Sequence, residues 1–232
     1  MPHGSIFDQE IVARLSPSAK RLLRRPRPRM RGVLHKWAAI LAIPAGVVLT
    51  IGASGIRASI SMAVFALGAV AMLGVSAIVH SRDWPPERVE MLVRLDHSAI
   101  FLTYATTATP VALLGLHGHV STWMMSVVWV AATVGIVAEW VPVHPPAGVV
   151  NAVYLSLGWS MLVFIPWLIK DLTVGQLVLL FVGGGAYTIG AVVVGARKPD
   201  PWTDVFGYHE IWHVFVVMAV LMHGLMAYSL GW

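Results

Sequence analysis

The chain has 232 residues and a formal net charge of +5, and 57% of its residues are hydrophobic while 12% are charged. In soluble domains about half of the residues are apolar and about a quarter are charged. The composition therefore excludes an ordinary soluble protein and indicates one that lies in a lipid bilayer. The chain has no cysteine, which excludes a disulfide framework and a thiolate metal site, so a bound metal would need His, Asp or Glu ligands.

Residues 1–34 form the first predicted region, a basic cytoplasmic tail that precedes a membrane domain of residues 35–232. The tail contains several prolines and the basic residues Arg14, Lys20, Arg21, Arg24, Arg25, Arg27, Arg29 and Arg31. We expect it to be disordered and to touch anionic lipid headgroups. No aromatic residue is interleaved with these charges, so nucleic-acid binding is not expected. The first apolar run begins too far along the chain for a secretory signal peptide.

Seven apolar runs follow, each close to the roughly 20 residues that a helix needs to cross the hydrocarbon core. They lie near 37–55, 58–80, 95–116, 121–141, 148–169, 174–196 and 208–230. Their connections are short, such as the turns at Ser54 and His144, so consecutive helices should be antiparallel neighbours. The runs do not pair into two similar halves, which argues against an inverted-repeat transporter. The predicted fold is an all-α, seven-helix membrane bundle.

The distribution of lysine and arginine predicts the orientation of this bundle. Cytoplasmic loops of membrane proteins carry an excess of both residues. With the N-terminus inside, fourteen of the sixteen Lys and Arg residues lie on the inner side, and Arg57 and Lys170 lie outside. The sequence therefore predicts a cytoplasmic N-terminus and an outer C-terminus.

Ionisable side chains inside membrane spans are costly and usually functional. Seven of them lie near the predicted inner ends of the helices: His80, Asp96, His97, Glu139, His209, Glu210 and His213. His209 and His213 are four residues apart and share one helix face. Ser76 and His80 have the same spacing on a helix that runs the opposite way. Three imidazoles, the Asp96 carboxylate and the Ser76 hydroxyl can therefore converge in one layer of the inner leaflet.

Such a layer can hold a catalytic zinc ion. Three histidine ligands leave a fourth position for a water, whose pKa falls to about 7, and Asp96 would orient that water. In the alternative interpretation the histidines satisfy one another or backbone carbonyls, or they form a proton relay. Imidazole ligands favour zinc, although affinity alone does not exclude copper or nickel.

The segment from His209 to His213 reads HEIWH, which matches the H-E-x-x-H signature of many zinc metalloproteases. Those proteases take their third ligand from downstream residues, but the nineteen residues after His213 contain no acid. The third ligand must come from upstream, which points to His80 and argues against a protease. Glu210 is rotated about 100° from the ligand face. From there it could act as a general base, but we expect it to cap the last helix or to pair with Arg94 or Arg197.

Several other residues have expected packing roles. The sixth run contains GGGAYTIG, which predicts a close-packing helix face rather than a phosphate loop. Pro110 and Pro166 are expected to kink their helices. We expect His223 to pack or to form a hydrogen bond rather than to bind metal, and Glu139 to pair with a neighbour at the inner rim.

Four stretches of the chain carry a family resemblance: SAIVHSRDWPPERVEMLVRLDHSAIFLTYATTATP, YLSLGW, GGGAYTIGAVVV and FGYHEIWHVFVVMAVLMH. Over residues 31–232 the chain resembles the bacterial hemolysin III family, within the progestin and adipoQ receptor superfamily. The pattern is S-x-x-x-H, then Asp at the start of the third helix, then H-x-x-x-H on the seventh. The resemblance implies that Asp96 holds a water at the metal, that Ser76 supplies a hydroxyl, and that the zinc ligands are His80, His209 and His213. It assigns no role to His35 or His97.

The function that this resemblance implies is hydrolysis of a membrane-lipid amide, as in the ceramidases of the superfamily, in the bacterial inner membrane. Two alternatives stay open. One is a non-enzymatic lipid sensor with a structural zinc, which would have four protein ligands. The other is a hemolysin-like pore, which would need oligomers around a water-filled channel, although the sequence shows no ring-forming charge pattern. The oligomeric state is left open.

Overall fold

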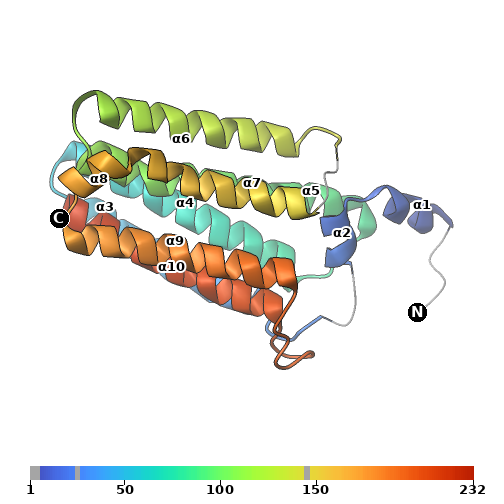
Figure 1. The fold of residues 1–232 in the computed structure, drawn as a ribbon. Coiled ribbons are helices and arrows are strands. Elements are labelled where there is room, and N and C mark those ends of the chain that lie inside the picture. Colours follow the sequence, from blue (N-terminus) through green and yellow to red (C-terminus); the bar gives the residue numbers. More distant parts are fainter. Residues whose placement is uncertain (1–5, 24–26, 144–146) are drawn as a thin grey trace.

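Seven long helical spans run the length of the bundle in the computed structural model, which describes residues 6–23, 27–143 and 147–232 (Figure 1). They are α3 (Val33–Gly52), α4 (Ile56–Ser81), α5 (Pro86–Pro110) with the π-helical turn η1 (Val111–Gly115), α6 (Gly118–Glu139), α7 (Ala147–Trp159) with the 3-10 turn η2 (Ser160–Phe164) and α8 (Ile165–Asp171), α9 (Val174–Ala196) and α10 (Tyr208–Gly231). All seven spans are long and apolar enough to cross a membrane. The predicted all-α, seven-span architecture is therefore confirmed.

Two spans begin earlier than their hydropathy indicates. α5 begins at Pro86 rather than near 95, and α3 begins at Val33 rather than near 37. The first turns of α5 are charged, so a search for apolar runs misses them. Proline suits the first turn of a helix, and Arg94 pairs with Glu90 one turn earlier at 3.2 Å. The turn predicted at His144 lies outside the described residues.

Both prolines that were predicted to kink a helix lie beside an irregular turn. Pro110 directly precedes the π-helical turn η1, and Pro166 follows the 3-10 turn η2. Proline has no backbone N–H and its ring crowds the carbonyl one turn earlier, which disrupts the regular hydrogen-bond ladder. The fifth span consequently consists of three helical segments instead of one helix.

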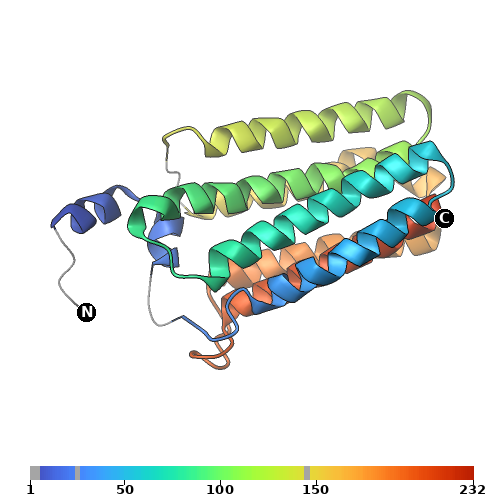
Figure 2. The same cartoon turned by 180° about the vertical axis from the view of Figure 1, so that it is seen from behind.

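The central helices of the bundle are α4 and α5, which contain the largest buried share of any span. α4 packs against both α3 and α5, α6 packs on α5, and α10 packs on α9, α4 and α3 (Figures 1 and 2). The outward face of α6 exposes valines, among them Val130, Val134 and Val137. An apolar outer surface of this kind suits contact with lipid chains.

Glycines on α9 allow close contact with α10. A Cβ added at Gly183 would meet the His223 ring, and one added at Gly190 would meet Trp212. These two glycines confirm the predicted close-packing face, since small residues let membrane helices approach each other. Gly184 and Gly185 are different, because an added Cβ would have no neighbouring atom within 4 Å at either position.

The basic N-terminal region is folded where the structure describes it. Two short helices, α1 (Ile6–Arg14) and α2 (Pro17–Leu22), lie at one end of the bundle (Figure 1). Leu15, Ala19 and Leu22 are buried against α4 and α5, and the backbone N–H of Ser16 donates to Glu90 Oε2 at 2.9 Å. The expectation of disorder is wrong for residues 6–23, because positions 15, 19 and 22 form an apolar stripe that packs on the bundle.

Candidate metal centre

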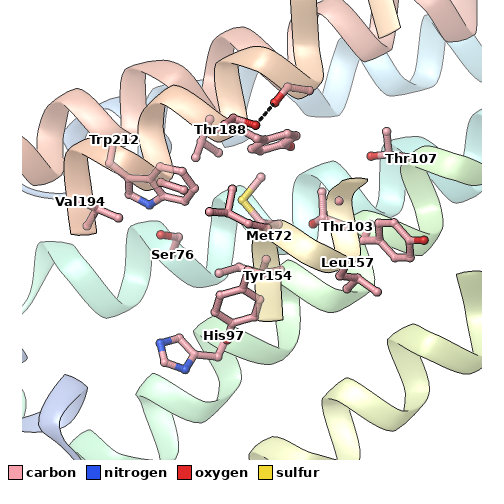
Figure 3. Close-up of a pocket in the computed structure, with 18 of the residues that line it drawn as sticks. Met72, Ser76, His97, Thr103, Thr107, Tyr154, Leu157, Thr188, Val194 and Trp212 are labelled. Carbon is pink, nitrogen blue, oxygen red and sulfur yellow. Dashed lines mark hydrogen bonds between the residues drawn. The ribbon is translucent and has the colours of Figure 1, made fainter. Parts of the chain in front are cut away.

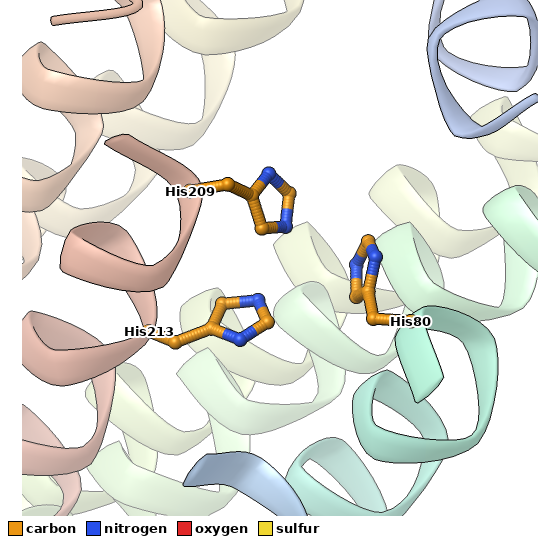
Figure 4. A group of neighbouring side chains, drawn as sticks. All are labelled: His80, His209 and His213. Carbon is orange, nitrogen blue, oxygen red and sulfur yellow. The ribbon is translucent and has the colours of Figure 1, made fainter. Parts of the chain in front are cut away.

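α4 ends close to where α10 begins, and this brings three histidines together. His80 lies in the last turn of α4, while His209 and His213 lie in the first two turns of α10. One ring nitrogen from each residue lies within 4.8 Å of the other two. The ring centroid of His80 is 4.5 Å from that of His209 and 5.2 Å from that of His213, and the latter two are 4.7 Å apart. This histidine triad (His80, His209 and His213; Figure 4) could hold a metal ion.

The hydrogen bonding of the triad fits a metal site. His80 Nδ1 and His209 Nε2 are buried and have no hydrogen-bond partner among the described residues. A buried polar atom without a partner costs about 1–3 kcal/mol, and a metal ion would take up both lone pairs. Imidazole nitrogens are ligands that zinc favours. The donor set therefore fits a zinc ion.

Asp96 on α5 lies directly beside the triad, with its Oδ2 at 3.3 Å from His80 Nε2. A carboxylate that contacts a metal-ligating histidine fixes the orientation of that ring. Ser76 lies one turn before His80 on α4, where it is buried and lines the adjoining cavity (Figure 3). The structure thus brings together all five residues that the sequence pointed to.

His35 is a fourth histidine at this site, and it comes from the first turns of α3. Its ring stacks on that of His213, with centroids 3.7 Å apart and an interplanar angle of 11°. Both of its ring nitrogens are buried and lack a hydrogen-bond partner within the described chain. The sequence assigned no function to His35. The available signal was a histidine at the start of an apolar helix, the same signal that pointed to His209.

Glu210 fixes the start of α10 and thereby the positions of the two histidines on it. The backbone N–H of Gly207 donates to Glu210 Oε2 at 2.9 Å, which confirms the predicted cap. The predicted pairing with Arg94 or Arg197 is wrong, because Arg31 Nε donates to Glu210 Oε1 instead. The segment before α3 runs beside the loop before α10, where the N–H of Arg29 donates to the carbonyl of Asp204 at 3.0 Å.

A cavity of about 630 Å³ adjoins the triad. Figure 3 shows part of its lining between the helices. The triad and Arg31 line one end, and Val111, Leu168 and His223 line the other. His209 and His223 are fourteen residues apart on α10, so the cavity extends about 21 Å at 1.5 Å per residue. Its walls combine apolar side chains with hydroxyl groups, among them those of Thr103, Tyr104, Thr107, Tyr154 and Thr188.

Three other ionisable side chains of the spans make their contacts outside the triad. His223 is buried with its Nε2 at 3.3 Å from the Leu180 carbonyl oxygen, which confirms its predicted hydrogen-bonding role. Glu139 pairs with His97 at 3.1 Å, so its predicted pairing is confirmed with a partner that the sequence did not identify. Arg94, which was expected near Glu210, donates instead to the backbone carbonyl of Glu139 at 2.8 Å.

Comparison with known proteins identifies the family. Residues 23–224 match the family described as Haemolysin-III related. The chain is 33% identical over 189 residues to Hemolysin-3 of Bacillus cereus, a match that covers 80% of this chain and 83% of that protein. It is 31% identical over 188 residues to the Hemolysin-3 homolog of Bacillus subtilis (strain 168), covering 80% of this chain and 85% of that one. With its seven apolar spans, the chain is thus a multi-pass cell-membrane protein that belongs to the Haemolysin-III related family.

Proposed function

We propose that this protein is a zinc-dependent intramembrane hydrolase that cleaves the amide bond of a membrane lipid. The observation that carries the proposal is the histidine triad, which lies beside Asp96 at one end of an elongated cavity. Catalytic zinc sites have three protein ligands, whereas structural sites have four. Within the described residues the group that could bind metal comprises three histidines and does not include His35.

The residues around the triad supply the proton transfers that amide hydrolysis needs. When bound, zinc would polarise the carbonyl and activate a water for attack. Asp96, which contacts His80 at the edge of the triad, would accept one proton from the attacking water and donate it to the departing amine. The water oxygen joins the carbonyl carbon, the C–N bond breaks, and the products are a fatty acid and an amine.

The cavity has the dimensions and the lining of a site for one lipid chain. Its length of about 21 Å along α10 exceeds the roughly 15 Å of hydrocarbon in one leaflet of a bilayer. Trp159, Leu162 and Phe181 line the cavity and are also among the exposed large hydrophobic residues of the bundle. These three residues lie on the α7–η2 segment and on α9. A lipid can therefore enter sideways from the bilayer between these segments.

The proposal is tested on the full chain, purified in detergent without chelator. We expect about one zinc per chain by elemental analysis, and release of fatty acid and amine from an N-acyl sphingoid base, an N-acyl ethanolamine or an N-acyl amino acid by mass spectrometry. A chelator should abolish the release and added zinc should restore it. A folded protein that contains no metal and releases no product from these amides would contradict the proposal.

Gly184 offers a way to block the lipid chain without disturbing the fold. It lines the cavity, and a Cβ added there would meet no atom within 4 Å. Gly184→Phe should therefore fill part of the cavity and lower hydrolysis of a long-chain amide by about tenfold or more, with the zinc content unchanged. Gly185→Phe is the matched control, because its added Cβ is equally unhindered and the residue does not line the cavity. Equal activity of the two variants would show that the chain binds elsewhere.

The names of the two Bacillus relatives favour membrane lysis as a second candidate function. Leakage of dye from lipid vesicles measures it directly. Leakage that persists after the zinc has been removed would support lysis and would count against the hydrolase. A lipid sensor with a structural zinc is separated by the same assays, since it would bind lipid in the cavity and release neither dye nor product.

A further inference from the structure

A second polar cluster faces the cavity and takes no part in binding the metal. It consists of His97 on α5, Glu139 at the end of α6 and Tyr154 on α7. His97 Nδ1 is 3.1 Å from Glu139 Oε2, and the Tyr154 hydroxyl donates to Glu139 Oε1 at 3.0 Å. His97 and Tyr154 both line the cavity that contains the triad (Figure 3). Three separate helices thus converge to hold one imidazole at the cavity wall.

The His97 ring is held firmly in its orientation. The Tyr154 ring packs edge-on against it at a centroid distance of 5.9 Å, and Phe101 packs against Tyr154 at 5.0 Å. Arg94 donates to the backbone carbonyl of Glu139 at 2.8 Å, which fixes the end of α6. A side chain that is held in this way presents its free atom in one defined direction and costs little entropy on binding a ligand.

The hydrogen-bond partners determine what the exposed nitrogen of His97 can recognise. A carboxylate only accepts hydrogen bonds, so the bond to Glu139 requires that His97 Nδ1 carries the proton. In the neutral ring Nε2 then holds a lone pair and accepts a hydrogen bond. The side chain is 19% exposed, and Nε2 has no partner within the part of the chain that the structure describes. In its neutral form His97 thus places an acceptor without a donor at the cavity wall.

Asp96 and His97 are consecutive on α5, so their side chains diverge by about 100° around the helix. Asp96 contacts His80 on α4, while His97 contacts Glu139 on α6. A lipid head in the cavity therefore meets the triad on one side and His97 on another. An amide presents two different groups to these two sides, a carbonyl oxygen that a metal can polarise and an N–H that an imidazole can accept.

We infer that His97 accepts a hydrogen bond from the amide N–H of the bound lipid and makes the site selective for secondary amides over esters. This inference rests on the proposed function for the lipid class, and it adds the residue that distinguishes an amide from an ester. Glu139 is a positioning residue that sets the tautomer of His97. An ester has no N–H and leaves Nε2 unpaired, so it should bind about 10- to 100-fold more weakly than the matching amide.

The test measures binding rather than turnover. The full chain with the substitution Asp96→Asn is purified with its metal, so that added lipids stay intact. N-ethyl hexadecanamide, its N-methylated tertiary amide and ethyl hexadecanoate then compete with a fluorescent fatty acid. We expect the secondary amide to bind about 10- to 100-fold more tightly than the other two. His97→Phe and His97→Asn should bring the three affinities together, and Glu139→Gln should reduce the preference. Tyr154→Phe keeps the hydrogen bond between Glu139 and His97, so this variant should retain most of the preference for the secondary amide.

The outcomes separate this inference from the proposed function. Equal binding of amide and ester before His97 is changed, or an unchanged preference in a folded His97 variant, would overturn the inference even if the native protein hydrolyses amides. A preference that depends on His97 in a protein that hydrolyses nothing would refute the hydrolase and leave His97 as the selectivity residue of a lipid-binding site.

Discussion

Replacing His80, His209 and His213 together with alanine should reduce the metal content from about one ion per chain to near zero. The three nitrogens lie within 4.8 Å of one another, and the triple variant removes every imidazole of the group that could hold a metal ion. Elemental analysis of wild type and variant, purified in parallel, measures the effect. Lipid amide hydrolysis should disappear together with the metal, because the proposed chemistry requires it.

His223→Ala is the matched control for this experiment. His223 is also a buried histidine of α10 that lines the cavity, but it bonds to the Leu180 carbonyl and lies far from the triad. The control should keep its metal, although the loss of a buried side chain will lower its stability. A triple variant that retains zinc would place the metal elsewhere, and a control that loses it would show that the metal depends on overall packing.

Asp96→Asn should lower amide hydrolysis by about 10²- to 10⁴-fold, which is the usual contribution of a general base. Asparagine has nearly the same shape and can still bond to His80 Nε2, which Asp96 Oδ2 contacts at 3.3 Å. It cannot take a proton from water. The zinc content at saturating zinc should therefore stay the same while product release, followed by mass spectrometry, nearly stops.

Asp171→Asn is the control for the loss of an acid, because Asp171 lies at the other end of the bundle beside His117. It should hydrolyse amides at the wild-type rate. If the Asp96→Asn variant instead bound zinc more weakly and lost it, Asp96 would act by orienting His80, as outer carboxylates of zinc sites do. Full activity in Asp96→Asn would mean that another group accepts the proton.

The spans and the triad could be predicted because both depend on regular periodicities. Each span has an apolar run of about 20 residues. The first turns of α5 are charged and lie outside its apolar run, so the same criterion does not detect them. His209 and His213 are one turn apart, so they share a helix face whatever the rest of the fold does. His80 is at matching depth on a helix of opposite direction. Helix geometry and short connections are enough to bring these three histidines to one depth.

The other contacts of the site depend on how each helix is rotated and on which distant segments meet. Arg31 and Glu210 are 179 residues apart, and nothing in the local sequence of either residue identifies the other. The stacking of His35 on His213 requires that α3 packs beside α10. The cluster of His97, Glu139 and Tyr154 takes its residues from three helices. Hydropathy defines the membrane depth of a residue but not its direction around the helix axis, so these partners could not be derived.

The origin of the triad in α4 and α10 also constrains the order in which the protein can be made. His80 enters the bilayer with the second span, whereas His209 and His213 arrive with the seventh. Until the five spans from α5 to α10 have been synthesised and inserted, the imidazole of His80 lies in the membrane without its two partners. The triad can therefore assemble only after the last span has packed against the second, and a bound ion would mark a bundle whose biosynthesis is complete.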